Sequence, residues 1–196
     1  MTNYYEMVMP YNGDLKNRQF LHGQMKKRLL PKDVSERNFI YQVLVRGDQH
    51  LVHVRSEAPH IIEGNRWISR EFDFSEGDTI ELNLVMAATK RVRDPNRNYK
   101  PVVKRLSEDE LAPFALNELL RAGLDVDQSS IDATFTQNES FQINKRDHGN
   151  WYVATADIRA KAVVSDLNAF KNAFIHGIGR KKTYGLGLIN AKKMNS

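Results

Sequence analysis

Cysteine is absent from the 196-residue sequence, and so is any long hydrophobic run. The first absence excludes disulfides and thiolate metal sites, which leaves six histidines and the carboxylates as potential metal ligands. The second excludes a transmembrane helix, because such a helix needs about 18 or more consecutive apolar residues. The N-terminal string MTNYYEMVMP has no basic stretch followed by an apolar one, so we expect no secretory signal and a cytoplasmic location.

Basic residues outnumber acidic ones, with a formal net charge of +5 and a pI near 9.4, and they are unevenly distributed. Residues 90–105 contain seven bases and one acid, residues 180–196 contain five bases and no acid, and a third basic cluster lies at 16–32. Each segment taken alone is more often only a solvated surface. Three such segments together indicate a groove for a polyanion such as nucleic acid.

The apolar content of 41% is sufficient for a core, and the length suits one large domain or two small ones. The first module, residues 1–76, has apolar side chains at every fourth position of a predicted helix, and a turn at Gly47 and Asp48 that predicts a hairpin. The secondary structure of residues 59–70 is ambiguous from the sequence. The predicted elements are a strand at 4–9, a helix at 14–30 capped by Asp14, strands at 38–46 and 51–55, and an edge strand at 71–74.

The second module, residues 80–196, repeats this order more clearly. Ser107 and Glu110 form a capping box that predicts a helix start. The predicted elements are strands at 80–88, 131–143, 151–164 and 184–189, a helix at 111–120, and a helix from Ser165 to His176. We therefore predict an α+β chain of two tandem ferredoxin-like (RRM-like) βαββαβ domains.

The sharpest local signal is the run HGIGRKKTYGLGLIN at residues 176–190, in which glycines flank three consecutive bases. Glycine permits close backbone approaches, and the bases between them suit phosphates. A nucleotide-binding loop is the obvious rival, but such loops follow a strand and open a helix, whereas this run follows a helix and enters a strand. A helix C-terminus alone explains Gly177 but not the density of glycine and charge.

A histidine on the first predicted helix is the best candidate for chemistry. Gln19 lies three residues before His22 and Lys26 four residues after it, so the three side chains occupy adjacent turns. A lone histidine on an amphipathic helix is more often structural, although its unperturbed pKa of about 6.5 suits proton transfer at neutral pH.

The helix, the pattern G-x-G-R-x-K-x-x-G-x-G-L and the terminal strand resemble the glycine-rich end of the CRISPR-associated endoribonucleases that process precursor CRISPR RNA within Cascade surveillance complexes. The type I-E branch is the most similar, and the resemblance covers nearly the whole chain. It implies that His22, in the string FLHGQM, is catalytic. It also implies a CRISPR repeat RNA hairpin and other subunits of a Cascade-like complex as partners, with no membrane.

The chemistry that this resemblance implies needs neither metal nor cofactor. RNA carries its own nucleophile, the 2′-hydroxyl, so His22 would act as general base or acid while Lys26 or a base of the glycine run stabilises the phosphate. The products would be a 2′,3′-cyclic phosphate and a 5′-hydroxyl. The family usually has a tyrosine where this chain has Gln19. Either Tyr184 or Tyr11 reaches the site through space, or histidine and cations suffice, or cleavage is slow or lost.

The RNA-binding surface should combine the basic segment at residues 90–105 and the glycine run at 176–190. We assign to it Lys90, Arg91, Arg93, Arg97, Lys100, Gly177, Gly179, Arg180, Lys181, Lys182, Gly185 and Gly187. Metal binding by His50, His53 and His60 is disfavoured, because no cysteine or convincing carboxylate accompanies them. Two alternatives stay open: a non-catalytic RNA-binding subunit of a ribonucleoprotein, and a ferredoxin-like ribosomal or RNA-chaperone protein.

Overall fold

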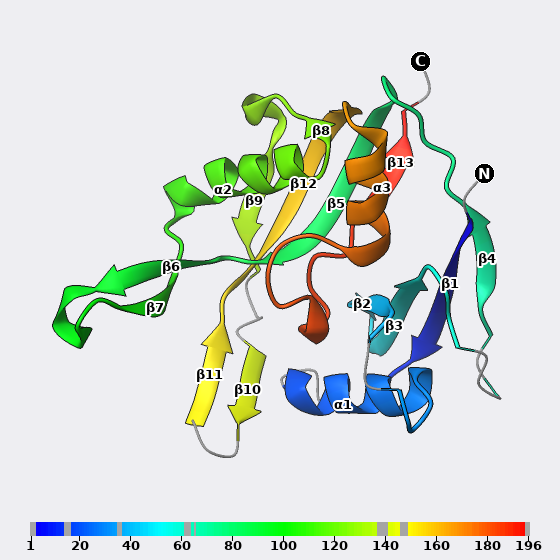
Figure 1. Cartoon of the computed structure of the whole chain (residues 1–196), viewed down its shortest axis with the longest axis horizontal. Coiled ribbons are helices and arrows are strands. Elements are labelled where there is room, and N and C mark those ends of the chain that lie inside the picture. The colour runs from blue at the N-terminus through cyan, green and yellow to red at the C-terminus, as the bar shows by residue number, and fades with distance from the viewer. Residues whose placement is uncertain are drawn as a thin grey trace.

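Two antiparallel sheets form most of the structure, one from residues 3–71 and the other from residues 79–193 (Figure 1). A computed structural model describes residues 3–13, 17–34, 37–60, 64, 66–136, 141–145 and 149–194. It describes only the backbone of Arg97, Lys100, 141–145 and 149–152. Within these ranges, no helix has the length and apolarity needed to cross a bilayer.

The N-terminal sheet has the strand order β2-β3-β1-β4 and is accompanied by the helix α1 (Arg18–Leu29). Its strands are β1 (Asn3–Pro10), β2 (Phe39–Arg46), β3 (Gln49–Ser56) and β4 (Ile68–Glu71). The predicted apolar stripe of the helix is confirmed, because Leu21, Met25 and Leu29 are buried in one cluster with strand residues. The N-cap is Asn17, whose Oδ1 accepts the Phe20 N–H at 3.0 Å, while the predicted cap Asp14 lies outside the described residues.

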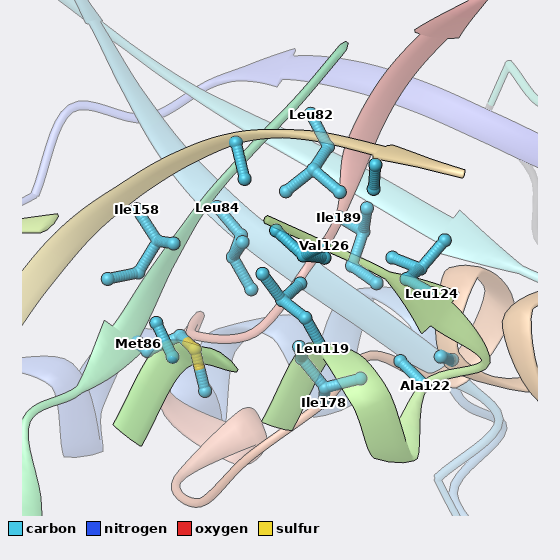
Figure 2. Packing of buried hydrophobic residues seen from close by; sticks show 14 of the residues in the cluster. Leu82, Leu84, Met86, Leu119, Ala122, Leu124, Val126, Ile158, Ile178 and Ile189 are labelled. Atoms are coloured by element: carbon cyan, nitrogen blue, oxygen red, sulfur yellow. The ribbon is translucent and has the colours of Figure 1, made fainter. Parts of the chain in front are cut away.

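The C-terminal sheet has the order β13-β5-β12-β8, and β9 also pairs with β12. Strand residues such as Leu84 and Ile158 pack with Leu119 of the helix α2 in one large core (Figure 2). The predicted capping box is confirmed at the start of α2. The elements are β5 (Thr79–Ala87), α2 (Glu108–Arg121), β8 (Leu124–Asp125), η2 (Gln128–Ser130), β9 (Asp132–Phe135), β12 (Thr155–Val164), α3 (Leu167–His176), η3 (Lys182–Tyr184) and β13 (Asn190–Lys193).

Two hairpins project from the C-terminal domain (Figure 1). The first, which we call the basic hairpin, consists of β6 (Thr89–Asp94) and β7 (Lys100–Arg105), joined through the short helix η1 (Pro95–Arg97). The second consists of β10 (Phe141–Lys145) and β11 (Gly149–Val153). In the view of Figure 1 the basic hairpin extends away from α1. The hairpin of β10 and β11 points downward, to about the height of α1 in the picture.

The predicted fold class is confirmed. Numbered along each domain, the principal strands of both sheets have the order 2-3-1-4 of the ferredoxin-like fold. The described residues between β3 and β4 contain no helix. The domain boundary predicted between residues 76 and 80 stays a prediction, and it falls at a turn whose Gly77 has a φ of 86°.

Several predicted strand limits are wrong. The last strand is β13 (Asn190–Lys193) instead of 184–189, because left-handed residues at 185 and 187 prevent regular pairing there. The edge strand is β4 (Ile68–Glu71) instead of 71–74. The long strands predicted at 131–143 and 151–164 are each divided, which creates the hairpin of β10 and β11. The N-cap of α3 is Asp166 instead of Ser165.

Arg55 of β3 joins the two domains. Its side chain is only 3% exposed, and Nη1 donates to the carbonyls of Phe174 and Ile189 at 2.8 Å each. On the other side of the guanidinium, Nε and Nη2 donate to Glu6 Oε1 at 3.1 and 2.8 Å. The planar guanidinium of arginine has five N–H donors, so it can donate hydrogen bonds to partners from both domains at once.

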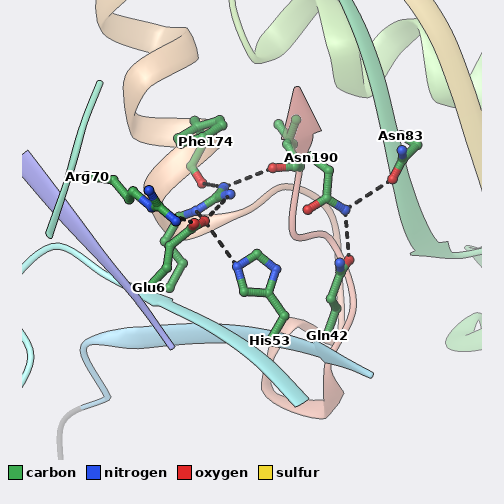
Figure 3. Close-up of polar contacts among 9 residues, drawn as sticks. Glu6, Gln42, His53, Arg70, Asn83, Phe174 and Asn190 are labelled. Carbon is green, nitrogen blue, oxygen red and sulfur yellow. Dashed lines mark hydrogen bonds and ion pairs between the residues drawn. The ribbon is translucent and has the colours of Figure 1, made fainter. Parts of the chain in front are cut away.

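Further polar contacts surround this connection (Figure 3). His53 Nε2 lies 3.1 Å from Glu6 Oε1, and Arg70 Nε lies 3.9 Å from Glu6 Oε2. The side-chain amide of Asn190 donates to Gln42 of the N-terminal sheet and to Asn83 of the C-terminal sheet, both at 3.1 Å. The domains are therefore fixed to each other by a polar network in which Arg55 and Gln42 are buried.

The segment between the two Arg55-bound carbonyls contains residues 177–187, which we call the glycine loop. Gly185 has a φ of 83°, and a Cβ on it would lie 2.8 Å from the ring of Tyr41 in β2. Gly187 has a φ of 79°, and a Cβ on it would lie 2.0 Å from the carbonyl oxygen of Ile178. The Tyr41 hydroxyl donates to the Thr183 carbonyl at 3.0 Å. Glycine thus lets the loop pack closely onto the N-terminal domain.

Replacing Glu6 by glutamine should flatten the acid destabilisation of the protein. Burial opposes ionisation of Glu6, but hydrogen bonds from His53 and Arg55 and their charges outweigh it and lower its pKa from 4.5 to about 2. A carboxylate with a lowered folded-state pKa stabilises the native state above pH 4.5, and that stabilisation is lost as the pH falls toward 2. Its upper limit is about 3 kcal/mol.

The measurement is the free energy of unfolding in urea at pH 7, 5 and 3. Glu6→Gln should be less stable than the wild type at pH 7 and should lose less stability between pH 5 and pH 3. Glu71→Gln, on the exposed edge strand of the same sheet, is the matched control and should follow the wild type. Parallel losses in Glu6→Gln and wild type would contradict the role assigned to Glu6.

Replacing Gly187 by alanine should destabilise the protein by more than about 2 kcal/mol, because strain in the left-handed region adds to a clash with backbone. Gly47→Ala is the control, since Gly47 has a φ of 57° and a Cβ added to it would have no neighbour within 4 Å. It should lose only about 1–2 kcal/mol from the left-handed conformation. Equal losses of unfolding free energy in the two variants would show that the loop is not tightly packed.

Candidate active site

His22 lies where α1 and the glycine loop meet. Its ring is edge-on to that of Tyr184, with centroids 5.9 Å apart and an interplanar angle of 61°. One turn earlier on α1, Gln19 Oε1 accepts a hydrogen bond from the Tyr184 hydroxyl at 3.1 Å. The fold therefore brings residues 165 positions apart in sequence into one polar cluster.

The surroundings of His22 favour its neutral form. Burial lowers the pKa of His22, the charges of Arg37 and Lys26 lower it further, and a hydrogen bond with the Thr183 backbone opposes them. Nδ1 is buried and has no hydrogen-bond partner among the described residues. A neutral imidazole can accept a proton during catalysis.

The surroundings of Tyr184 favour the protonated form of its phenol, whereas those of His22 favour the unprotonated imidazole. It belongs to η3, and its side chain is partly buried between the loop and α1. Burial raises the pKa of its phenol above the ordinary value. The hydroxyl therefore keeps its proton at neutral pH and can donate it.

Three cations surround this cluster at different depths. Lys26 is partly exposed on α1, one turn after His22. Lys182 Nζ donates to the Gly177 carbonyl at 3.1 Å, and burial together with the charge of Arg37 lowers the pKa of Lys182. Arg37 is the third, and its Nη1 is buried without a hydrogen-bond partner among the described residues.

Arg37 was not predicted from the sequence. It precedes β2 in an irregular segment, and nothing in the string SERNF distinguishes it from a solvated arginine. Its charge acts on both His22 and Lys182, so it belongs electrostatically to the same cluster. A buried guanidinium nitrogen without a partner is costly unless a ligand completes it, and a phosphate oxygen would do so.

The glycine loop contributes backbone more than surface. Gly177, Gly185 and Gly187 are buried and Gly179 is partly buried, so their contacts are within the protein itself. Of the bases between them, Arg180 is exposed. Lys181 has a φ of 65° and its Nζ lies 5.8 Å from the centroid of the Tyr184 ring.

The basic hairpin offers a separate charged surface. Arg91 pairs with Val103 and Arg93 with Pro101, so both arginines are on one face of the hairpin, and both are exposed. Lys90 is on the other face and forms an ion pair with Glu110 of α2. The backbone places Arg97 in η1 and Lys100 at the start of β7, but their side chains lie outside the described residues. Figure 1 shows that this hairpin extends away from α1.

Among the described residues, His53 and His176 have carboxylate partners outside the cluster. His53 contacts Glu6 in the domain interface, and the His50 carbonyl accepts the Tyr11 N–H at 2.9 Å. Within the part of the chain that the structure describes, no three His, Asp or Glu side chains are grouped as metal ligands.

Solved structures with this fold span essentially the whole chain. Cas6e from Escherichia coli str. K-12 is 19% identical with a TM-score of 0.72, over 97% of this chain and 100% of that chain. Cse3 of Thermus thermophilus, bound to an RNA representing a pre-cleavage complex, is 14% identical with a TM-score of 0.71, over 98% of this chain and 100% of that chain. A chain of a CRISPR RNA-guided surveillance complex is 16% identical with a TM-score of 0.67, over 98% and 100%.

At these identities the structural likeness establishes the fold alone. No curated protein matches the chain by sequence. A family model described as CRISPR associated protein, however, matches residues 7–192. Because that match extends over nearly the entire sequence, the chain belongs to this family of CRISPR associated proteins.

Proposed function

We propose that the protein is a metal-independent endoribonuclease that binds CRISPR repeat hairpins and cleaves precursor CRISPR RNA into guide RNAs. The observation that carries this proposal is the cluster of His22, Tyr184 and Gln19, with cations around it, at the contact of α1 and the glycine loop. Family membership supports it, as does the likeness to Cse3, a CRISPR endoribonuclease solved with bound RNA.

The proposed reaction starts from the 2′-hydroxyl beside the scissile phosphate. His22 is neutral at pH 7 and accepts the proton of that hydroxyl, which then attacks phosphorus. Lys26 and Arg37 stabilise the charge that develops on the phosphate oxygens. Gln19 orients the Tyr184 hydroxyl beside the imidazole. The products are a 2′,3′-cyclic phosphate and a 5′-hydroxyl.

The proposed RNA-binding surface combines two regions. Arg91, Arg93, Arg97 and Lys100 of the basic hairpin contact phosphates of the stem, and Arg180 with its neighbours Lys181 and Lys182 contacts the RNA near the cut. Lys90 contributes less to RNA binding than these residues, because its charge is already balanced by Glu110. The buried glycines support RNA binding by shaping the loop that presents these bases.

The protein then stays bound to its product as a subunit of a Cascade-like effector complex in the cytoplasm. The likeness to a chain of a CRISPR RNA-guided surveillance complex supports this assembly. Slow turnover is compatible with such a role, because each copy needs to cut only once.

Replacing His22 by alanine should abolish cleavage and preserve binding. General acid–base catalysis contributes about 10²–10⁴-fold, so single-turnover cleavage of a repeat hairpin in excess EDTA should fall by at least that factor. The Kd for the hairpin should change by less than about threefold, because phosphate contacts dominate affinity. His50→Ala, a histidine at the start of β3, should cleave like the wild type.

Two results would reject this mechanism. One is cleavage by His22→Ala at the wild-type rate, and the other is a wild type that cleaves only when a divalent cation is added. A wild type that binds the hairpin tightly but never cleaves it would instead favour the non-catalytic RNA-binding subunit.

Replacing Arg91 and Arg93 together by alanine should weaken RNA binding and reduce its salt dependence. Each phosphate contact contributes about 0.7–0.9 to the slope of log K against log salt, so the slope should fall by about 1.4–1.8. The matched control is Arg159→Ala with Lys161→Ala, which removes the same charge from alternate exposed positions of β12. Equal slopes for the two double variants would remove the hairpin arginines from the RNA surface.

A further inference from the structure

The hydroxyl of Tyr184 is held toward α1 by the fold of the glycine loop. Tyr184 ends η3, between Lys181 and Gly185, whose left-handed φ values of 65° and 83° turn the chain on each side. The preceding carbonyl, that of Thr183, is fixed by the Tyr41 hydroxyl at 3.0 Å. The phenol then donates to Gln19 Oε1 at 3.1 Å, with its ring against His22.

The proposed cleavage needs two proton transfers at different oxygens. One group must take the proton of the 2′-hydroxyl, and another must protonate the 5′-oxygen, which is a poor leaving group as an alkoxide. His22 suits the first task because it is neutral at pH 7. The second task needs a side chain that keeps its proton at pH 7 and lies beside His22.

Tyr184 meets both conditions. Gln19 has no acidic proton to transfer. Burial keeps the phenol of Tyr184 protonated by raising its pKa. The nearby charge of Lys181, whose Nζ lies 5.8 Å from the ring centroid, would stabilise the phenolate left after transfer.

We propose that Tyr184 is the catalytic residue that donates a proton to the 5′-oxygen of the leaving nucleoside. The inference rests on the proposed endoribonuclease function. The 2′-oxygen gives its proton to His22 and bonds to phosphorus, the bond from phosphorus to the 5′-oxygen breaks, and that oxygen takes the proton of Tyr184. Exchange with water then removes the proton from His22 and returns one to Tyr184, so no net proton is consumed.

Two other tyrosines are excluded by their surroundings. Tyr11 is 5% exposed, and its hydroxyl would lie 2.3 Å from a Cβ at Gly13, so it is packed against its own turn. Tyr41 is fully buried, so a substrate oxygen does not reach its hydroxyl. Of the alternatives to a tyrosine on α1 that the sequence left open, the geometry points to Tyr184.

The test uses an RNA hairpin in which sulfur replaces the bridging 5′-oxygen at the cut. A thiolate leaves without protonation, so this substrate does not need a general acid. On the oxygen substrate, single-turnover cleavage by Tyr184→Phe should be at least about 100-fold slower than by the wild type. On the sulfur substrate, the two proteins should agree within about threefold. His22→Ala should be slow on both substrates, because the 2′-hydroxyl still needs a base.

Tyr11→Phe removes one hydroxyl in the same way and should match the wild type on both substrates. The proposal is overturned if Tyr184→Phe cleaves the oxygen substrate at the wild-type rate, or if it is equally slow on both substrates, since a misfolded loop would impair both. A wild type that cleaves neither substrate would reject the endoribonuclease function itself, which separates the two failures.

Discussion

The guanidinium of Arg55 connects the two ferredoxin-like domains and, with them, the parts of the site. It binds the carbonyls of Phe174 and Ile189, which flank the glycine loop on both sides, and its charge is balanced by Glu6. The ring centroid of Phe174 lies 3.7 Å from the guanidinium carbon, so the group is enclosed by protein. Such a buried charge is tolerable only when all of its partners are present. The position of the loop therefore depends on an arrangement that fails as a whole if one partner is lost.

The site at the loop combines groups whose protonation states are set by their surroundings. Burial and neighbouring cations keep His22 neutral, while burial keeps Tyr184 protonated. A base and an acid that differ in this way can act in one reaction without exchanging protons with each other beforehand. Arg37 adds a guanidinium nitrogen that the described protein leaves without a partner. A phosphate oxygen of a bound RNA would supply a partner for this nitrogen.

The elements with local signals were predictable from the sequence, and the contacts between them were not. The stripe of α1, the capping box of α2 and the turn at Gly47 are encoded within a few residues each, and all three are present. His22 and Gln19 were predicted as site residues from their spacing and a family resemblance. Arg55 was missed because its main partners are backbone carbonyls, which every residue carries, so its role has no sequence signature. Arg37 was missed because its importance comes from burial beside His22.

The limits of strands failed for a related reason. The segment 184–189 has the composition of a strand, but the loop must bend to follow the surface of β2, and the ladder begins only at Asn190. A sequence pattern registers which residues favour extended backbone, whereas the neighbouring domain decides whether they can pair.

The dependence of α1 on the glycine loop has a consequence for biosynthesis. Gln19, beside His22 on α1, is synthesised 165 residues before Tyr184, and the carbonyl of Ile189 follows later still. The N-terminal domain can fold first, yet a nascent chain has no complete cluster at its first helix. Reactive geometry therefore arises only after both segments have been made, and by then the basic hairpin between them has been made as well.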